Sequence, residues 1–518
     1  MSQQRHILFN AAMVAAAFLL AAGLGLVRNV IIAQTFGLDA ELDAFYAAFK
    51  LPDLFFTIVA GGALATAFIP IFAEYLAEED LNGGWYLASA VTNWVVISVS
   101  VLSLLAMLTA PWLVGTLIAP GFTAPQQAET ASLMRIVLLS TLFFGISAVQ
   151  SSVLHGFKHF LLPALAPILY PVGVIIGAIW LTPAMGTAGL AWGAVLGSFL
   201  HLTVKVPMLF RYGFRWWPTL GVNSTALRRV LVLMGPRVLD LAVFHLGLVA
   251  STNLASRLGE GSVAALEWGW EFMQLPETVI GTAFGLVIFP TLAELAAQRD
   301  QEALRNTLGN ALRLLLALTV PAACGLILLG LPIVQLVYQR GQFDSAAGLA
   351  VYQALQFFAL GLVGHVCLEV VARLFFAQKD TITPLLVAMG AGVLQVILGL
   401  VLMTFLAHGG LALANSLAIT IEVLILLVIL HRRLGGIQAR QTASFLLRVA
   451  GASALMCLVV ETVNRGASGL GIPTLWTVGL AIVAGGVSYA SAGLVFNVWR
   501  IDDLVSLLGF RVSNGQRK

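Results

Sequence analysis

Charged side chains occur inside several long apolar segments of this sequence. The segments cover about residues 8–36, 44–76, 227–256 and 262–296. The charged residues within them are Arg28, Lys50, Asp53, Arg237, Asp240, Glu267, Glu271 and Glu277. A charge inside a membrane span is costly, and it usually faces a partner or a water-filled cavity. We therefore expect these four segments to surround a polar site near the middle of the membrane.

Two of these segments carry a proline beside their charged residues. Residues 49–53 read FKLPD, and they correspond to residues 273–277, which read MQLPE. A proline inside a helix removes a backbone hydrogen bond and kinks the helix. Paired interrupted spans at corresponding places indicate the binding site in membrane proteins built from repeats. We therefore expect ligand-binding side chains to gather near these prolines.

The same charges also have a simpler structural interpretation. Arg237 and Asp240 are three residues apart and could neutralise each other, and the same holds for Lys50 and Asp53. Arg28 has no acidic residue three or four positions away, so it is expected to face a cavity.

Four other polar residues are expected to have structural roles. Lys205 and Arg313 lie near the ends of apolar segments, so we expect their side chains to extend to the membrane surface. His365 and Glu369 lie one helical turn apart and are expected to form a buried hydrogen-bonded pair.

The composition requires a membrane. The chain has 518 residues, of which 59% are hydrophobic and 10% are charged, and its mean hydropathy is +0.96. A soluble domain carries roughly 25% charged residues. No basic stripe with interleaved aromatic residues suggests nucleic acid, and no Walker A sequence suggests ATP. Dependence on the membrane potential or on an ion gradient remains as an energy source.

No cofactor or metal is expected. The three cysteines lie in apolar runs without metal-ligand spacing, and His155 with His159 lacks a third ligand. All loops are short, which argues against a membrane enzyme with catalytic loops.

The apolar segments predict about fourteen transmembrane helices. The remaining segments cover residues 86–117, 131–154, 161–182, 187–210, 308–337, 347–376, 382–407, 410–431, 443–463 and 474–498. The run at 11–27 resembles a signal peptide, but the helical pattern continues to Phe36, so we expect a retained first span.

The basic residues predict the orientation. With the N-terminus in the cytoplasm, 17 of the 27 basic residues fall in inner loops and tails, whereas the outer loops keep Arg257, Arg340 and Arg465. We expect a multi-pass membrane protein with both termini in the cytoplasm.

Similar sequence phrases recur about 220 residues apart. Ile69-Pro70 matches Phe289-Pro290, and residues 189–191 (GLA) match residues 410–412. The repeat predicts two parallel six-helix lobes and an additional C-terminal helix pair. The expected boundaries are 1–215 for the first lobe, 216–226 for a cytoplasmic linker, 227–435 for the second lobe, and 436–518 for the pair with a cytoplasmic tail.

Several motifs resemble the MurJ/MviN family. These motifs are VRN at 27–29, DAF at 43–45, AFKLP at 48–52, FIP at 68–70, APGF at 119–122, GQF at 341–343 and KDT at 379–381. The family belongs to the multidrug/oligosaccharidyl-lipid/polysaccharide exporter superfamily. Its members flip lipid II, the undecaprenyl-pyrophosphate-linked peptidoglycan precursor, across the inner membrane. The resemblance implies an alternating-access flippase whose last two helices hold the polyprenyl tail.

The resemblance also implies a substrate site. Its members bind the pyrophosphate with arginines, because guanidinium groups contact phosphate oxygens bidentately. As aligned with the family, only Arg28 of these arginines is retained, Ala22, Phe56 and Glu271 replace others, and Gln274 replaces a glutamate. The expected substrate-binding residues are Arg28, Asp43, Lys50, Asp53, Glu271 and Gln274. The family sometimes binds sodium, and Asp240 is the candidate ligand here.

Three other functions stay open. The acids at 267 and 271 are compatible with an exporter of organic cations, and another polyprenyl-linked saccharide is a possible cargo. The lost arginines are also compatible with an idle paralogue that scaffolds wall assembly. The expected partners are the polyprenyl-pyrophosphate lipid, membrane lipids and cell-wall synthesis proteins.

Overall fold

The computed structural model describes residues 2–60 and 63–499, and this part of the chain contains helices and no strand. Within it, ten helices are long and apolar enough to cross a membrane, and Leu20–Phe36 and Leu64–Ala77 are shorter apolar helices. The all-α membrane fold is therefore confirmed, whereas the count of fourteen spans stays a prediction. The expected cytoplasmic tail at 500–518 lies outside the described residues.

The chain divides into two compact units. The first comprises Met1–Ala264 with Arg340–Ala347, and the second comprises Ala265–Gln339 with Gly348–Lys518. The lobe boundaries expected from the repeat, at 215, 227 and 436, stay a prediction.

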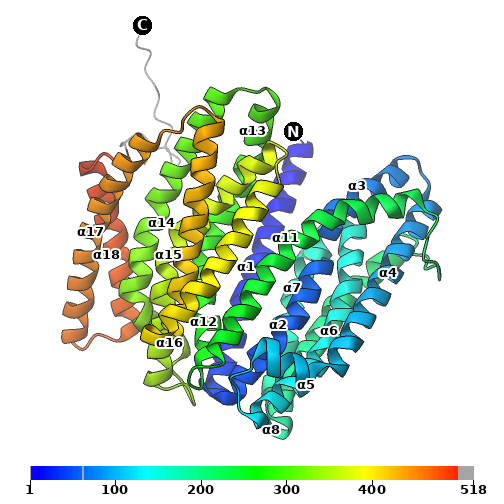
Figure 1. Cartoon of the computed structure of the whole chain (residues 1–518), viewed down its shortest axis with the longest axis horizontal. Helices are drawn as coiled ribbons and strands as arrows, with labels where there is room; N and C mark the ends of the chain where they lie inside the picture. Colours follow the sequence, from blue (N-terminus) through cyan, green and yellow to red (C-terminus); the bar gives the residue numbers. More distant parts are fainter. Residues whose placement is uncertain (1, 61–62, 500–518) are drawn as a thin grey trace. The chain divides into compact units, whose positions relative to one another are not determined.

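The first unit is built around α6, which packs against α2, α3, α4 and α9 (Figure 1). Its core is rich in aromatic rings, since Phe72 contacts Phe68, Trp85 and Phe157. The helices of this unit are α1 (Ser2–Phe36), α2 (Ala40–Ala60), α3 (Ala63–Ala77), α4 (Leu81–Leu108), α5 (Ala110–Leu113), α6 (Ala124–Gly156), α7 (Leu161–Ile176), α8 (Thr182–Met185), α9 (Thr187–Thr203), α10 (Val206–Arg211) and α11 (Thr225–Ala255), with π-helical turns at Val114–Ile118 and Gly177–Leu181.

Glycines bring α7 and α9 into close contact. A Cβ atom on Gly173 would lie 2.2 Å from Cα of Gly197, and one on Gly177 would lie 2.6 Å from Cα of Gly193. No side chain larger than hydrogen fits at these distances. The two helices therefore pack backbone against backbone, and a movement of one must carry the other with it.

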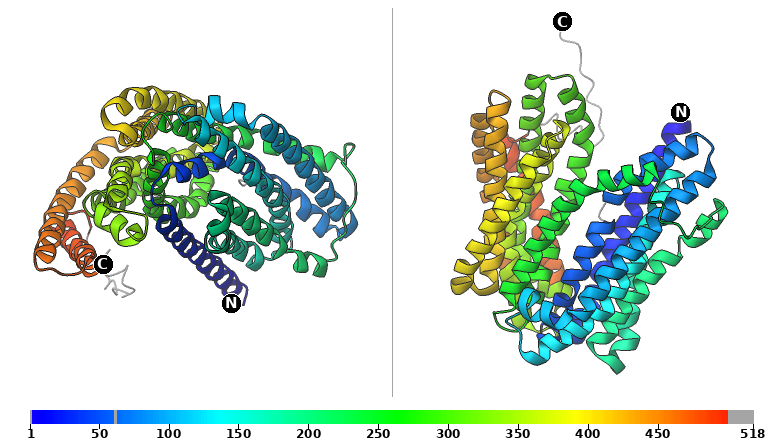
Figure 2. Two further views of the ribbon diagram at one scale, coloured as in Figure 1. Left: turned by 90° about the horizontal axis from the view of Figure 1, so that it is seen from below. Right: turned by 45° about the vertical axis from the view of Figure 1, so that its right-hand side comes forward.

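The second unit contains the two longest helices, α14 (Gln301–Tyr338) and α16 (Ile382–Arg433). Its other elements are α12 (Ser262–Glu277, whose first turn belongs to the first unit), a π-helical turn (Thr278–Thr282), α13 (Ala283–Ala297), α15 (Ser345–Ala377, which also begins in the first unit), α17 (Ala439–Gly469) and α18 (Thr474–Val495). The last two helices lie side by side and pack against α14 (Figures 1 and 2). The Tyr489 hydroxyl donates to the Ala317 carbonyl at 2.6 Å and fixes α18 to α14.

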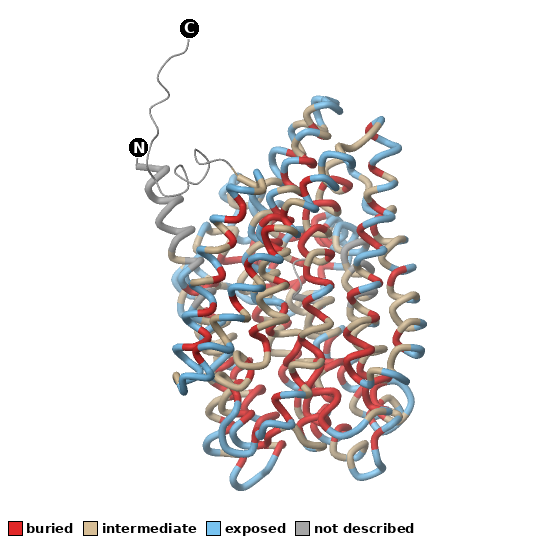
Figure 3. Tube along the Cα trace, turned by 90° about the vertical axis from the view of Figure 1, so that its left-hand side faces the viewer, coloured by how far each residue is buried: buried red, intermediate tan, exposed pale blue. Residues whose placement is uncertain are grey.

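Apolar residues also cover much of the outer surface. Buried and exposed residues alternate along single helices, as Figure 3 shows. The exposed residues include Leu447, Leu458, Trp476 and Val487, each more than 60% exposed. Because such large apolar surfaces are unfavourable in water, these faces fit contact with lipid.

The internal repeat appears in the backbone. Asp80 caps α4 by accepting the Gly83 N–H at 2.8 Å, and Asp300 caps α14 by accepting the Ala303 N–H at 2.9 Å. Left-handed residues also recur at corresponding positions. These pairs are Glu79 and Arg299, Lys158 and Lys379, and Gly186 and Ala407. Corresponding segments therefore adopt the same turns even where their residues differ.

A charged cap closes the loop before α16. Burial opposes ionisation of Asp380, but the hydrogen bonds from the Thr383 hydroxyl and backbone N–H and from Arg433 outweigh it and lower the pKa of Asp380 to about 2. The Arg433 guanidinium lies 2.6 Å from the carboxylate. Asp380 therefore stays ionised at physiological pH, and this contribution to stability is present above the ordinary aspartate pKa.

The pair Gly186 and Ala407 gives a test of backbone strain. Both residues have positive φ, at 58° and 48°, with ψ of −141° and −132°. Such a conformation is unfavourable for a residue with a Cβ atom, by about 1 kcal/mol or more. We expect Ala407→Gly to raise the thermal unfolding midpoint of the purified protein and Gly186→Ala to lower it.

A helical glycine provides the control for this pair. Gly466 lies inside α17 without a positive φ, and a Cβ there would meet nothing within 4 Å, as at Gly186. Gly466→Ala should raise the midpoint because alanine favours the helix. Equal effects of Gly186→Ala and Gly466→Ala would contradict the strain argument.

Candidate functional site

Arg28 lies in the second half of α1, which packs against α7. Its side chain is half-buried, and its Nε donates to Oδ1 of the buried Asn29 at 2.9 Å. Arg28 and Asp53 of α2 both interact electrostatically with the Tyr170 hydroxyl of α7. Three helices of the first unit thus place a cation, an anion and a phenol in one region.

Lys50 belongs to the same helix as Asp53 and is buried, with 7% of its surface exposed. It lies within electrostatic reach of His245 in α11. A lysine buried inside a membrane span is rare and usually functional. Arg28 and Lys50 therefore give the first unit two candidate ligands for an anionic group.

The two prolines behave differently in their helices. Helix α2 continues through Pro52 to Ala60. Helix α12 ends one residue after Pro276 and continues as the π-helical turn Thr278–Thr282. A π-helical turn widens the helix by one residue and is often found at functional sites. The expected interruption is therefore present in the second segment.

Asp43 is almost completely buried, with 1% of its surface exposed. One carboxylate oxygen accepts the Gly261 N–H at 2.7 Å, and the other accepts the Ala264 N–H at 2.8 Å. These groups belong to the first turn of α12 and the loop before it, where backbone N–H groups have no partner within the helix. The carboxylate therefore caps α12. Its expected contact with substrate stays a prediction.

The remaining expected substrate residues, Glu271 and Gln274, lie on α12 in the second unit. Together with Glu267 they follow a spacing of four and three residues, which puts them on one face of the helix. Glu267 and Glu271 are half-buried, and Gln274 is exposed. The expectation that they share a site with Arg28 and Lys50 stays a prediction.

Phe56 occupies a position where the family resemblance leads us to expect arginine. Its ring packs against Phe144 of α6, with ring centroids 4.8 Å apart. Phe144 in turn contacts Tyr170 at 5.4 Å. An aromatic cluster thus fills the space beside Tyr170, and no phosphate oxygen would find a hydrogen-bond donor on these two phenylalanine rings.

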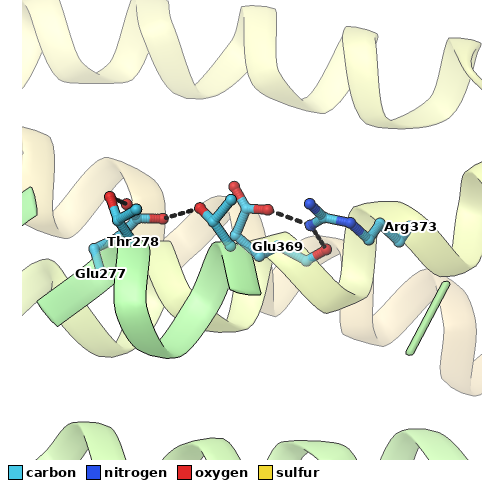
Figure 4. A network of polar contacts seen from close by, with 5 residues as sticks. Glu277, Thr278, Glu369 and Arg373 are labelled. Atoms are coloured by element: carbon cyan, nitrogen blue, oxygen red, sulfur yellow. Dashed lines mark hydrogen bonds and ion pairs between the residues drawn. The ribbon is translucent and has the colours of Figure 1, made fainter. Parts of the chain in front are cut away.

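A polar cluster of the second unit contains two carboxylates and one guanidinium. Arg373 forms an ion pair with Glu369 on α15, and Glu369 lies between Arg373 and Glu277 (Figure 4). Glu277 accepts hydrogen bonds from the hydroxyls of Thr278 and Thr282, at 3.3 and 3.4 Å. Two acidic side chains of this cluster thus share one guanidinium, so the cluster can attract one further positive charge.

The expected pair of His365 and Glu369 is wrong. His365 Nε2 lies 3.1 Å from the Asn415 side-chain oxygen, and its ring contacts Trp270. Glu369 is paired with Arg373 one turn further along α15, because an arginine offers a stronger, charged donor. The sequence already contained a signal for this pair, because Arg373 lies four residues after Glu369 and His365 lies four residues before it.

Asp240 and Arg237 lie in α11, and their side chains are outside what the structure describes. The sodium site expected at Asp240 therefore stays a prediction. Among the described residues, no group of three or more histidine, cysteine or acidic side chains is arranged to hold a metal ion.

Comparison with known proteins gives consistent matches. The profile of the family described as "Lipid II flippase MurJ" matches residues 32–496. The lipid II flippase MurJ of Burkholderia cenocepacia is 30% identical over 437 residues, covering 82% of this chain and 84% of that protein.

Solved structures resemble the whole fold. The structure titled "Lipid II flippase MurJ, inward closed conformation" matches with a TM-score of 0.79 and 25% identity, covering 95% of this chain and 100% of that chain. An inward-facing multidrug resistance MATE transporter of the MOP superfamily matches with a TM-score of 0.68 and 15% identity, covering 81% and 94% of the two chains.

The buried cap at Asp43 makes a testable prediction. Asp43→Asn keeps the shape of the side chain but removes its charge and one of its two acceptors. We expect the free energy of unfolding to fall by about 1–3 kcal/mol, because a buried backbone N–H at the start of α12 loses its acceptor. The thermal unfolding midpoint of the purified protein measures this effect.

Asp39 supplies the matched control, because it caps α2 in a more accessible position by accepting the Leu42 N–H at 2.9 Å. Asp39→Asn should lower the midpoint less than Asp43→Asn. An unchanged midpoint in Asp43→Asn together with lost transport would instead assign Asp43 to the substrate.

Proposed function

The chain belongs to the MurJ family of lipid II flippases, and we propose that it moves lipid II from the inner to the outer leaflet of the bacterial cytoplasmic membrane. The observation that carries this proposal is the pair of cations, Arg28 and Lys50, inside the first unit. The pyrophosphate head group of lipid II is anionic, so a cationic site in a hydrated cavity would compensate for its transfer out of water.

We propose that transport proceeds by alternating access, without covalent chemistry. Similar MATE structures are described as inward-facing and as outward-facing, with TM-scores of 0.68 and 0.58. The parallel repeat supports a motion of this kind, because corresponding turns such as those at Lys158 and Lys379 recur in both halves. Both termini would lie in the cytoplasm.

The last helix pair is proposed to accommodate the polyprenyl tail. Helices α17 and α18 have apolar outer surfaces and pack on α14 through Leu329, Met456 and Tyr489. A polyprenyl chain gains nothing from a polar cavity, so it would stay in contact with apolar helices while the head group crosses.

An exporter of organic cations is the second candidate function. It is favoured by the cluster in which Glu277 and Glu369 share one arginine. Reconstituted protein should move fluorescent lipid II and should not move cationic dyes. Complementation of a strain depleted of its own lipid II flippase tests the function in cells, and failure of both lipid II assays would refute it.

Arg28 provides the sharpest test of the substrate site. Lysine offers a point charge, whereas arginine offers a planar fork that matches two phosphate oxygens. Because a charge-assisted bidentate contact contributes about 1.5–3 kcal/mol, we expect Arg28→Lys and Arg28→Ala each to reduce lipid II transport roughly ten- to a hundredfold at normal membrane levels.

The control is Arg313→Lys, since Arg313 donates hydrogen bonds to the Asn310 side chain on α14 and the Gln441 side chain on α17. That variant should transport normally. Full activity of Arg28→Lys would remove the bidentate contact from the mechanism. Loss of transport in Glu271→Gln with an unaffected Arg28→Ala would indicate a cationic cargo.

Removal of the C-terminal pair tests the proposed tail-binding helices. A chain that ends at residue 435 should fold in the membrane, because lipid can replace the apolar contacts of α17 and α18 on α14. We expect it to lose transport of full-length lipid II in proteoliposomes. Normal transport by a truncated protein that is present at full level would exclude a role of this pair in binding the tail.

A further inference from the structure

Lys205 is located between α9 and α10, and its side chain is fully buried, with 0% of its surface exposed. The expectation that it extends to the membrane surface is therefore wrong. Its Nζ donates to the Ser147 carbonyl at 2.7 Å and to the Ser151 hydroxyl at 2.8 Å, both on α6. These acceptors draw the amine into the helix bundle.

The surroundings of Lys205 contain bases and no compensating acid. Both hydrogen-bond acceptors are neutral, and among the described residues no carboxylate pairs with the amine. The titratable groups near it are His201 on α9 and His155 on α6. An ammonium held only by neutral groups in an apolar interior costs several kcal/mol, whereas a neutral amine can donate the same two hydrogen bonds.

The second repeat shows that this position does not need a lysine for packing. Gly189 corresponds to Gly410, and the same offset relates Lys205 to Leu426. Leu426 is also fully buried. The corresponding helix therefore packs with an apolar side chain at this position, so the amine of Lys205 needs another explanation.

A continuous set of contacts connects Lys205 to the region of Arg28. The Ser147 hydroxyl lies 2.7 Å from His201 Nδ1, and the His201 ring packs against Phe144 at 5.2 Å. Phe144 contacts Tyr170, which interacts electrostatically with Arg28 and Asp53.

The backbone provides a second connection. A Cβ on Gly197 of α9 would lie 2.5 Å from the Tyr170 carbonyl of α7. Helix α9 therefore cannot shift at Lys205 without moving α7, and α7 packs against α1. A change in the charge of Lys205 that loosens α6 from α9 would thus be transmitted to the helices that carry Arg28 and Tyr170.

We propose that Lys205 is a proton-binding site that couples lipid transport to the proton gradient. This inference rests on the proposed function for its cargo. The neutral amine takes a proton from water and becomes an ammonium. Because an ammonium held only by neutral groups is unfavourable in an apolar interior, this charge weakens the packing of α6 against α9. Release of the same proton to water restores the neutral amine and the packed arrangement.

The transport test compares Lys205→Met with the wild-type protein in proteoliposomes. Methionine fills a similar volume and cannot bind a proton. For the wild type, we expect the rate of lipid II movement to change by up to about tenfold per unit of imposed pH difference, the limit for one proton. Lys205→Met should respond less than about twofold.

Lys158→Met is the matched control, because Lys158 is an exposed lysine at the end of α6. It should keep the wild-type response. If Lys205→Met folds poorly, Lys205→Leu replaces it, since leucine occupies the corresponding position of the second repeat. A wild-type response in a folded Lys205 variant, or no response in an active wild-type protein, would overturn the proposal.

A direct measurement separates this site from the proposed cargo. The chain has five lysines, so carbon-13 labelling of lysine gives few NMR signals. One signal should change between its ammonium and neutral-amine positions between about pH 5 and 9, and it should be missing in Lys205→Met. A Lys205 signal that stays in one form over this range would overturn the proposal, even if lipid II transport is normal. A titrating Lys205 in a protein that moves no lipid II would support the proton site and refute the proposed cargo.

Discussion

The carboxylate of Asp43 is the contact on which the arrangement of the first unit depends. It lies on α2 and accepts two backbone N–H groups at the start of α12, more than two hundred residues away in the sequence. Both partners are buried, so breaking the contact would leave polar groups without water or protein to replace it. The beginning of α12, which belongs to the first unit, is therefore fixed to α2.

The two halves of the repeat share backbone turns but differ in their buried charged side chains. Asp80 and Asp300 cap corresponding helices, and Gly186 and Ala407 adopt the same unusual turn. Within this shared frame, Lys205 is matched by Leu426, while the clustered acids Glu277 and Glu369 belong to the second unit. Duplication thus supplies two similar scaffolds, and substitution at buried positions such as Lys205 and Leu426 gives them different chemistry.

The sequence predicted the helical membrane fold because apolar segments of sufficient length have few alternatives in a bilayer. It also predicted the repeat, which depends on local turn residues such as Asp80. It could not predict the roles of Lys205 and His365, since each is decided by a partner on another helix. Spacing along one helix made Glu369 the nearest partner of His365, and only the packing of α15 shows that Asn415 is closer. Whether a lysine is exposed or buried depends on which groups of other helices lie near it, and the residue type alone does not show this.

The loss of cavity arginines has a physical consequence for the cargo. The family resemblance leads us to expect an arginine at Phe56, whose ring packs on Phe144, which in turn contacts Tyr170. This wall therefore offers apolar contact in place of the expected phosphate ligand. A site with fewer cations holds a pyrophosphate less tightly, and weaker ground-state binding lets the head group leave more readily. Transport needs release as much as capture, so one arginine with a lysine, Arg28 and Lys50, can suffice provided that the direction of movement comes from another source of free energy. A buried base such as Lys205, which changes its charge during the cycle, would supply that direction without adding to the affinity of the site.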